Sequence, residues 1–309
     1  MELSLFDLHC DTAGEMLNTG QGLEQNDLAV SLQKASAYRQ YVQVMAHWTP
    51  YRMNDEEGWQ AFWSMVKNLK SDPAVTSKKA VIQTVCPNAV NTPTLFLAVE
   101  DARILANRIE RVDSLFDNGI RILTPLWKGE TCIGGSHDTD PGLTDFGKAA
   151  LERAVMLGMI LDVSHASLAS AEDMFAIAKK HKRPVIASHS NAYEICPVSR
   201  NLRREQTEAI IASDGIVGIN LFTKFLKHNG NATAEDALAH IDYFLELGAS
   251  DHLALGCDMD GCDLPPDIPD VSALPRLAEL MCSHGYPEHL IHAVFYGNAY
   301  RFAQKYLTR

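Results

Sequence analysis

The sequence lacks the features that mark membrane, secreted and nucleic-acid-binding proteins. No apolar run approaches the ~18 residues of a membrane-spanning helix. The N-terminal residues show neither the basic cluster nor the apolar stretch of a signal peptide, so we expect a cytoplasmic protein with no membrane partner. The 27 Lys and Arg residues are outnumbered by 39 Asp and Glu, for a net charge of −12. This acidic balance argues against DNA or RNA as a partner, because phosphate binding requires a basic face.

The cysteines lack the pattern of a disulfide framework or a closed zinc site. Their number is odd, their spacing is wide, and no Cys-x-x-Cys motif occurs. We therefore expect free, buried thiols in a reducing compartment. The seven residues are Cys10, Cys86, Cys132, Cys196, Cys257, Cys262 and Cys282.

No low-complexity linker divides the chain, and we expect a single domain over residues 1–309. A repeating unit recurs instead, in which a helical pattern ends at a glycine or polar residue and a short apolar run follows. Eight such runs predict strands: Leu3–Leu8, Tyr41–Ala46, Leu95–Val99, Ile120–Thr124, Met159–Val163, Pro184–Ala187, Ile216–Asn220 and Leu253–Cys257.

These strands are continuously apolar, which is typical of parallel strands covered by helices on both faces. Eight strand–helix units in 309 residues predict an α/β fold, a (β/α)8 TIM barrel with long loops after the strands. A doubly wound open sheet is the alternative. No Gly-x-Gly-x-x-Gly motif follows the first strand, which weakens a nucleotide-binding form of that alternative.

Polar residues end five of the predicted strands. In a barrel these ends meet at one rim, where the active site lies. Any one histidine there could be structural, but three imidazoles and three carboxylates together predict a metal site for Zn²⁺, with Mn²⁺, Co²⁺ or Fe²⁺ possible. Six ligands suit two ions with a bridging carboxylate such as Glu100. The six candidate ligands are His9, Asp11, Glu100, His165, His189 and Asp258, and Asp101 and Asp260 are the other acidic residues at these strand ends.

Seven short motifs follow one another along the chain: Asp7–Thr12, Leu97–Asp101, Leu161–His165, Ala187–Ser190, Ser199–Asn201, Gly256–Gly261 and Tyr296–Asn298. In this order they resemble the renal (membrane) dipeptidase family of the amidohydrolase superfamily. The resemblance implies two zinc ions per chain, one held by His9 and Asp11 and the other by His165 and His189, with Glu100 bridging. It further implies that Asp258 handles the proton, that Arg200 receives the substrate carboxylate, and that the chain forms a homodimer. The sequence leaves open that Arg200 is a surface-loop arginine.

Two positions depart from the pattern of that family. Asp101 stands where the family has glycine, and Trp127 stands where it has a substrate-contacting histidine. His137, in the glycine-rich loop 129–142, is a candidate substitute for that histidine. Trp127, Phe222 and Phe225 are candidates for apolar substrate contacts in a pocket walled by loops 127–143, 191–203, 222–233 and 260–271.

Together these features predict a metal-dependent dipeptidase that acts through a hydroxide bridging the two cations, with Asp258 as acid and base. The alternatives are another hydrolase of the superfamily, acting on an N-acyl amino acid, a lactone or a phosphoester, and a non-catalytic metal-binding relative. Arg200 distinguishes the first alternative, because a substrate without a carboxylate gives that residue no role. The presence of Asp258 argues against the second.

Overall fold

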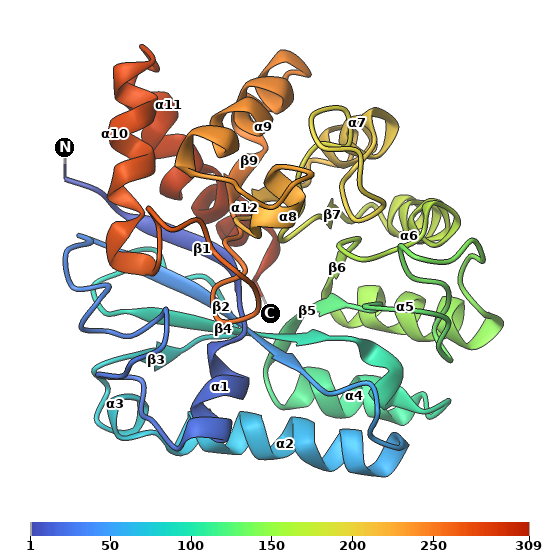
Figure 1. Cartoon of the computed structure of the whole chain (residues 1–309). Coiled ribbons are helices and arrows are strands. Elements are labelled where there is room, and N and C mark those ends of the chain that lie inside the picture. The colour runs from blue at the N-terminus through green and yellow to red at the C-terminus, as the bar shows by residue number, and fades with distance from the viewer. Residues whose placement is uncertain (1, 309) are drawn as a thin grey trace.

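Eight parallel strands arranged in a ring form the centre of the structure, a computed structural model that describes residues 2–308 (Figure 1). The order around the ring is β7-β6-β5-β4-β2-β1-β9-β8, and a bridge between Ala187 and Val217 joins the two end strands. The (β/α)8 barrel prediction is thus confirmed. The expected domain limits, Met1 and Arg309, lie outside the described residues. The strands are β1 (Leu5–Cys10), β2 (Tyr41–Trp48), β3 (Val81–Ile82), β4 (Thr94–Glu100), β5 (Ile120–Thr124), β6 (Ile160–Asp162), β7 (Val185–Ile186), β8 (Val217–Ile219) and β9 (Leu253–Leu255).

Helices surround the ring, and Figure 1, seen roughly along the barrel, shows α2, α4, α5, α6, α7, α9 and α10 outside the strands. Local sequence sets their ends. The Thr144 side chain caps α5 by accepting the Gly147 N–H, and Gly158 ends the helix in a left-handed conformation (φ 104°) just before β6. The helices are α1 (Thr12–Thr19), α2 (Asp55–Ser71), α3 (Pro73–Thr76), α4 (Glu110–Asp117), α5 (Asp145–Leu157), α6 (Leu168–Lys180), α7 (Arg204–Ala212), α8 (Thr223–Leu226), α9 (Ala234–Glu246), α10 (Pro275–Ser283), α11 (Glu288–His292) and α12 (Asn298–Tyr306).

All eight predicted runs overlap an observed strand, and β3 is the strand that the sequence did not predict. It has two residues and pairs only with Thr94 and Leu95 of β4, before the pairing of β4 with β5 begins at Leu97. A two-residue strand leaves no readable periodicity.

The first strand contains a β-bulge that matters for the site. Its pairing with β2 joins Asp7 to Gln43 and then Cys10 to Met45, so β1 has one extra residue over this stretch. Such a bulge changes which way the following side chains face. Leu8 belongs to one apolar cluster and Cys10 to the other, and His9 between them lies among the candidate ligands.

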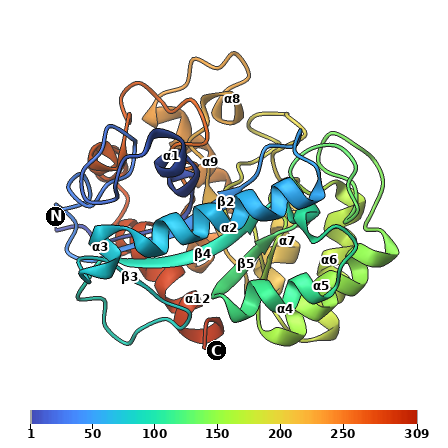
Figure 2. The same cartoon turned by 90° about the horizontal axis from the view of Figure 1, so that it is seen from below.

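The two ends of the barrel differ in chemistry. Figure 2 shows α12 at one end and the short helices α1 and α8 at the other. Tyr296 and Phe302 pack with strand residues such as Phe6 and Phe96, which closes the α12 end with apolar side chains. At the opposite end, where the strands finish, lie the polar strand-end residues predicted as metal ligands.

The described residues also bear on the predictions about membranes and cysteines. Within residues 2–308 no helix is both long and apolar enough to cross a membrane. All seven cysteines are free, as predicted, although Cys282 is exposed and Cys132 and Cys262 are only partly buried.

Candidate metal centre

The candidate ligands lie together at the carboxyl ends of five strands. Three overlapping groups of His, Asp and Glu bring their ligand atoms within 4.8 Å of one another. The groups are His9, Asp11 and Glu100; Glu100, His165 and His189; and His9, His189 and Asp258.

Glu100, the last residue of β4, lies between two sets of ligands. Its Oε2 atom is 3.5 Å from His9 Nε2, which is itself 3.5 Å from Asp11 Oδ2. Its Oε1 atom is 3.0 Å from His165 Nε2 and 3.6 Å from His189 Nε2. Each carboxylate oxygen therefore faces a different set, which is the arrangement expected of a bridging ligand.

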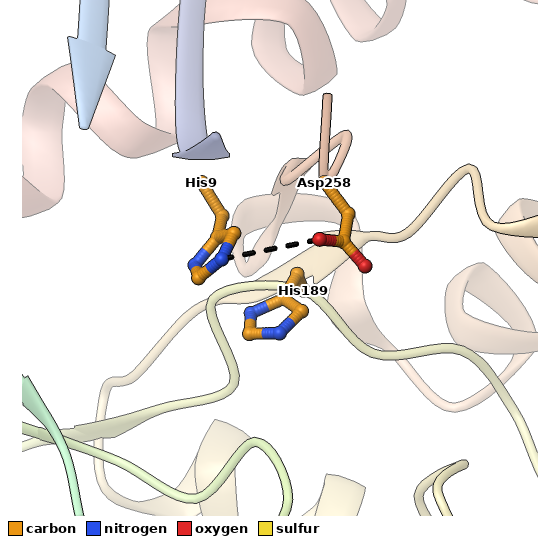
Figure 3. A group of neighbouring side chains, drawn as sticks. All are labelled: His9, His189 and Asp258. Carbon is orange, nitrogen blue, oxygen red and sulfur yellow. Dashed lines mark ion pairs between the residues drawn. The ribbon is translucent and has the colours of Figure 1, made fainter. Parts of the chain in front are cut away.

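Asp258 points into the same centre from the turn after β9, opposite His9 and beside His189 (Figure 3). Its Oδ1 atom is 4.0 Å from His9 Nε2, and its Oδ2 atom accepts a hydrogen bond of 3.0 Å from Asn220. Burial raises the pKa of Asp258 to about 7; His9 opposes this rise and the charges of Asp11 and Glu100 add to it. Gly261 leaves room for two of these carboxylates, because a Cβ at that position would overlap oxygens of Asp11 and Asp258 and displace them.

A buried network fixes the orientation of His189. Asp162, at the end of β6, accepts from Thr124 Oγ1 (2.6 Å), from Ser188 Oγ (2.5 Å) and from the N–H groups of Ser164 and Ser188. Because Ser188 donates its proton to Asp162, Ser188 Oγ accepts from His189 Nδ1 at 2.7 Å. The Nε2 lone pair of His189 is therefore left for the centre.

His165 is held through a main-chain contact. Its Nδ1–H donates to the carbonyl oxygen of Trp127 at 3.1 Å. Burial, with the nearby charge of Arg200, lowers the pKa of His165 to about 4, and burial likewise lowers the pKa of His189. Both imidazoles are thus neutral near pH 7, which is the state in which imidazole binds metal.

These side chains fit a divalent metal, and two of their contacts are difficult to explain without one. The Nε2 atom of His9 is buried and has no hydrogen-bond partner within residues 2–308, although two carboxylates lie 3.5 Å away. The Nε2 atoms of His165 and His189 face each other at 3.0 Å. Unpaired buried nitrogens cost free energy, whereas a cation would use all three lone pairs.

The centre opens into a cavity of about 480 Å³. Its floor includes Asp11, Glu100, His165 and Asp258, and apolar side chains form much of its walls. Three of the four predicted wall loops contribute to it, through Trp127 and His137, Phe222 and Phe225, and Asp260 to Cys262.

Comparison with known proteins identifies the family. The model of the membrane dipeptidase family (peptidase family M19) matches residues 1–307. The chain belongs to the membrane dipeptidase family. This membership implies a divalent metal, in agreement with the ligand groups above.

Two individual relatives each match only part of the chain. The chain is 34% identical over 200 residues to an uncharacterized protein in the pqqA 5′ region of Klebsiella pneumoniae, covering 60% of this chain and 72% of that one. It is 34% identical over 163 residues to the dipeptidase aclJ of Aspergillus oryzae, covering 52% of this chain and only 38% of aclJ.

Solved structures share the fold. A metallo peptidase from Rhodobacter sphaeroides, crystallised with a phosphinate mimic of the dipeptide L-Ala-D-Ala, superimposes with a TM-score of 0.90 at 23% identity, over 99% of this chain and all of that one. The dipeptidase AC, a metallo peptidase, superimposes with a TM-score of 0.90 at 24% identity over the full length of both chains.

Arg200 is the residue expected to bind the substrate carboxylate. Its side chain is buried beside the metal-ligand groups and is not exposed on a surface loop. Its guanidinium donates to the His189 carbonyl (2.9 Å) and to Ser190 Oγ (2.8 Å), and its Nε has no hydrogen-bond partner within residues 2–308. Arg200 lines a second cavity of about 230 Å³, which shares His137 and His165 with the larger one.

Trp127 stands where the family has a substrate-contacting histidine, and His137 is the candidate substitute for that histidine. Both residues line the larger cavity. The His137 ring lies 5.9 Å from that of His165, and its Nδ1 is 3.0 Å from Ser199 Oγ. Burial lowers the pKa of His137 to about 4, with the Arg200 charge contributing. A neutral imidazole therefore lies near the centre, although it comes from position 137 and not from position 127, where the family has its histidine.

Asp101, the other departure, is not among the metal-ligand groups. Its backbone has a left-handed conformation (φ 66°), which explains how glycine and aspartate can occupy the same place. Its side chain faces Arg103, with Oδ2 2.9 Å from the arginine Nε.

Two residues that hold the centre in place were not predicted. Asn220 fixes Asp258, and Asp162 fixes His189 through Ser188. Asn220 ended a predicted strand, so the signal that identified the ligands was also present there. Asp162 lay inside an apolar run, where nothing distinguished it from a structural residue.

Two other polar residues at strand ends, Asp260 and His47, have structural contacts. Asp260 accepts from Thr12 Oγ1 and from the Ala29 N–H, both at 2.6 Å. His47, at the end of the second predicted strand, is buried with its Nδ1 3.0 Å from the Ala98 carbonyl.

Proposed function

We propose that this membrane dipeptidase family member is a zinc-dependent dipeptidase, which cleaves the amide bond of dipeptides that have a free C-terminal carboxylate. The placement of Glu100 between two sets of ligands, with Asp258 beside them, carries the proposal. The family match supports the reaction class. The dipeptidase name of aclJ and the dipeptide mimic bound to the Rhodobacter sphaeroides protein support the substrate class.

The proposed ligands are His9 and Asp11 for one zinc ion and His165 and His189 for a second, with Glu100 shared. When bound, the ions would polarise the scissile carbonyl and activate a water molecule. Zinc suits this mixture of imidazole and carboxylate, and Mn²⁺, Co²⁺ and Fe²⁺ accept the same donors.

Asp258 is the proposed proton carrier. Asn220 occupies its Oδ2, so Oδ1 remains on the side of His9 to take a proton from the attacking water and return it to the leaving amine. With a pKa raised by burial to about 7, this carboxyl can both accept and release a proton near neutral pH.

Arg200 is the proposed site for the substrate carboxylate. The unpaired Nε–H remains available while the other guanidinium nitrogens hold the His189 carbonyl and Ser190. The C-terminal end of the substrate would therefore lie toward the cavity that Arg200 lines.

A turnover screen of L,L and L,D dipeptides with the zinc-loaded protein tests this function. We expect hydrolysis of dipeptides and little of N-acetyl amino acids, lactones or phosphotriesters. Hydrolysis of only one of those other classes would favour another reaction of the superfamily. No hydrolysis of any class, with metal bound, would favour a non-catalytic role.

Three further predictions accompany the proposal. The chain is proposed as one catalytic domain that forms a homodimer, and the compartment as reducing and cytoplasmic. Seven free cysteines support the reducing compartment.

A further inference from the structure

An aromatic cluster forms one wall of the cavity above the metal centre. It consists of Trp48 at the end of β2, Tyr51 in the loop that follows, and Trp127 after β5. The ring of Trp127 lies 4.8 Å from that of Trp48 and 6.0 Å from that of Tyr51, with Tyr51 stacked on it. Trp48 and Trp127 line the cavity, and Tyr51 lies outside them with 52% of its surface exposed.

The wall is held in place by one arginine. Arg103 donates to four carbonyl oxygens of loop 49–53, those of Thr49 (3.0 Å), Pro50, Tyr51 (3.3 Å) and Met53 (3.1 Å). A planar guanidinium can make this many directed bonds, whereas a lysine ammonium cannot.

Asp101 in turn orients that arginine. Its Oδ2 accepts from Arg103 Nε at 2.9 Å, and the carboxylate also caps the Arg103 main-chain N–H. Since Asp101 directly follows Glu100, the loop that bears Tyr51 is tied to the same strand end as the bridging carboxylate.

The opposite wall is also apolar. Phe222 and Phe225 line the same cavity and meet edge to face, with their ring centroids 4.6 Å apart. The cavity thus has a polar floor at the ligands and aromatic walls above it.

From these contacts we infer that the cavity selects substrates in which one of the two dipeptide side chains is large and apolar. Trp48 and Trp127 form the selecting surface, Tyr51 supports it by stacking on Trp127, and Arg103 and Asp101 position the loop that bears Tyr51. The inference rests on the proposed dipeptidase function and specifies its substrate class. Asp101 and Arg103 are positioning residues, which act through the loop.

The effect should be large enough to measure. One added methylene in an apolar pocket changes kcat/KM by ~10-fold or more, and a buried aromatic side chain offers much more contact area. We expect L-Phe-L-Ala or L-Ala-L-Phe to exceed L-Ala-L-Ala in kcat/KM by ~10- to 100-fold. We define this quotient as the selectivity ratio.

The test compares three substrates across matched variants of the zinc-loaded protein. Trp127→Ala removes the ring that joins Trp48 and Tyr51 but keeps the carbonyl that accepts from His165, and it should lower the selectivity ratio about tenfold or more. Arg103→Lys keeps the charge beside Asp101 but loses the directed bonds, and it should lower the ratio in the same direction. Arg153→Lys, on the outer helix α5 where the arginine pairs with Asp113, is the control and should leave the ratio unchanged.

Bound metal and the urea unfolding midpoint are measured for each variant, because a purely structural defect would reduce turnover of all three substrates alike. Tyr51→Ala, at an exposed position, provides a second test if Trp127→Ala does not fold. A ratio near one in the wild type, or a wild-type ratio that survives the wall and Arg103 changes, would overturn the inference while leaving the dipeptidase proposal intact. Failure to hydrolyse any of a wider set of dipeptides would overturn both.

Discussion

Arg200 offers the sharpest test of how the substrate is recognised, because its contacts divide into two kinds. Two of them support the centre itself, through the His189 carbonyl and Ser190. The Nε–H, buried and without a partner within residues 2–308, is the donor left for a substrate carboxylate. A hydrogen bond between charged groups contributes about 1.5–3 kcal/mol. At 1.4 kcal/mol per tenfold change, this corresponds to roughly 10- to 150-fold in kcat/KM.

The assay uses Arg200→Ala and the wild type on a dipeptide and on the same dipeptide with an amidated C-terminus. Loss of support for His189 should lower kcat/KM on both substrates. Loss of carboxylate binding should lower it further on the free acid alone, by the roughly 10- to 150-fold derived above. Equal losses on the two substrates would refute the proposed role, because the two changes would then be additive. Arg200→Lys, which keeps the charge without the fork, should recover part of the difference.

Three other predictions follow from the centre and from one buried histidine. Elemental analysis of the zinc-reconstituted, desalted protein should give close to two ions per chain, because Glu100 offers one oxygen to each set of ligands; a value near one would contradict the bridging role. Asp258→Asn should lower kcat by ~10²–10⁴ while metal content stays near wild type; loss of one ion instead would show that Asp258 is chiefly a ligand. His240, whose Nδ1 accepts from the Ala192 N–H and whose Nε2 contacts the Leu226 carbonyl, has a pKa lowered by burial to about 4. In the unfolded chain this imidazole takes up a proton near pH 6.5, whereas in the folded chain it stays neutral down to about pH 4. The contribution of neutral His240 to the free energy of unfolding is therefore complete above pH 6.5 and falls by roughly 3 kcal/mol as the pH drops from 6.5 to 4. Urea unfolding at several pH values should show this loss in the wild type, and a His240→Gln variant with the same acid slope would rule His240 out as its source.

The sequence by itself determined the barrel and the identities of the candidate ligands. Runs of apolar residues separated by helical patterns indicate parallel strands, and parallel strands of a barrel deliver their final residues to one rim. Hence His9, Glu100, His165, His189 and Asp258 could be grouped without coordinates, and the structure brings all of them within one cluster.

The tertiary structure decided what depends on the meeting of distant segments. The bulge in β1 arises from its register with β2, and no pattern within residues 5–10 reveals it. No sequence motif marks Arg103, yet it binds a loop some fifty positions earlier in the chain. Arg200 could be matched by its spacing from His189, yet only folding buries its guanidinium behind that ligand. Strand content is thus set locally by side-chain polarity, whereas the orientation of each functional group depends on hydrogen bonds between segments that are far apart in the sequence.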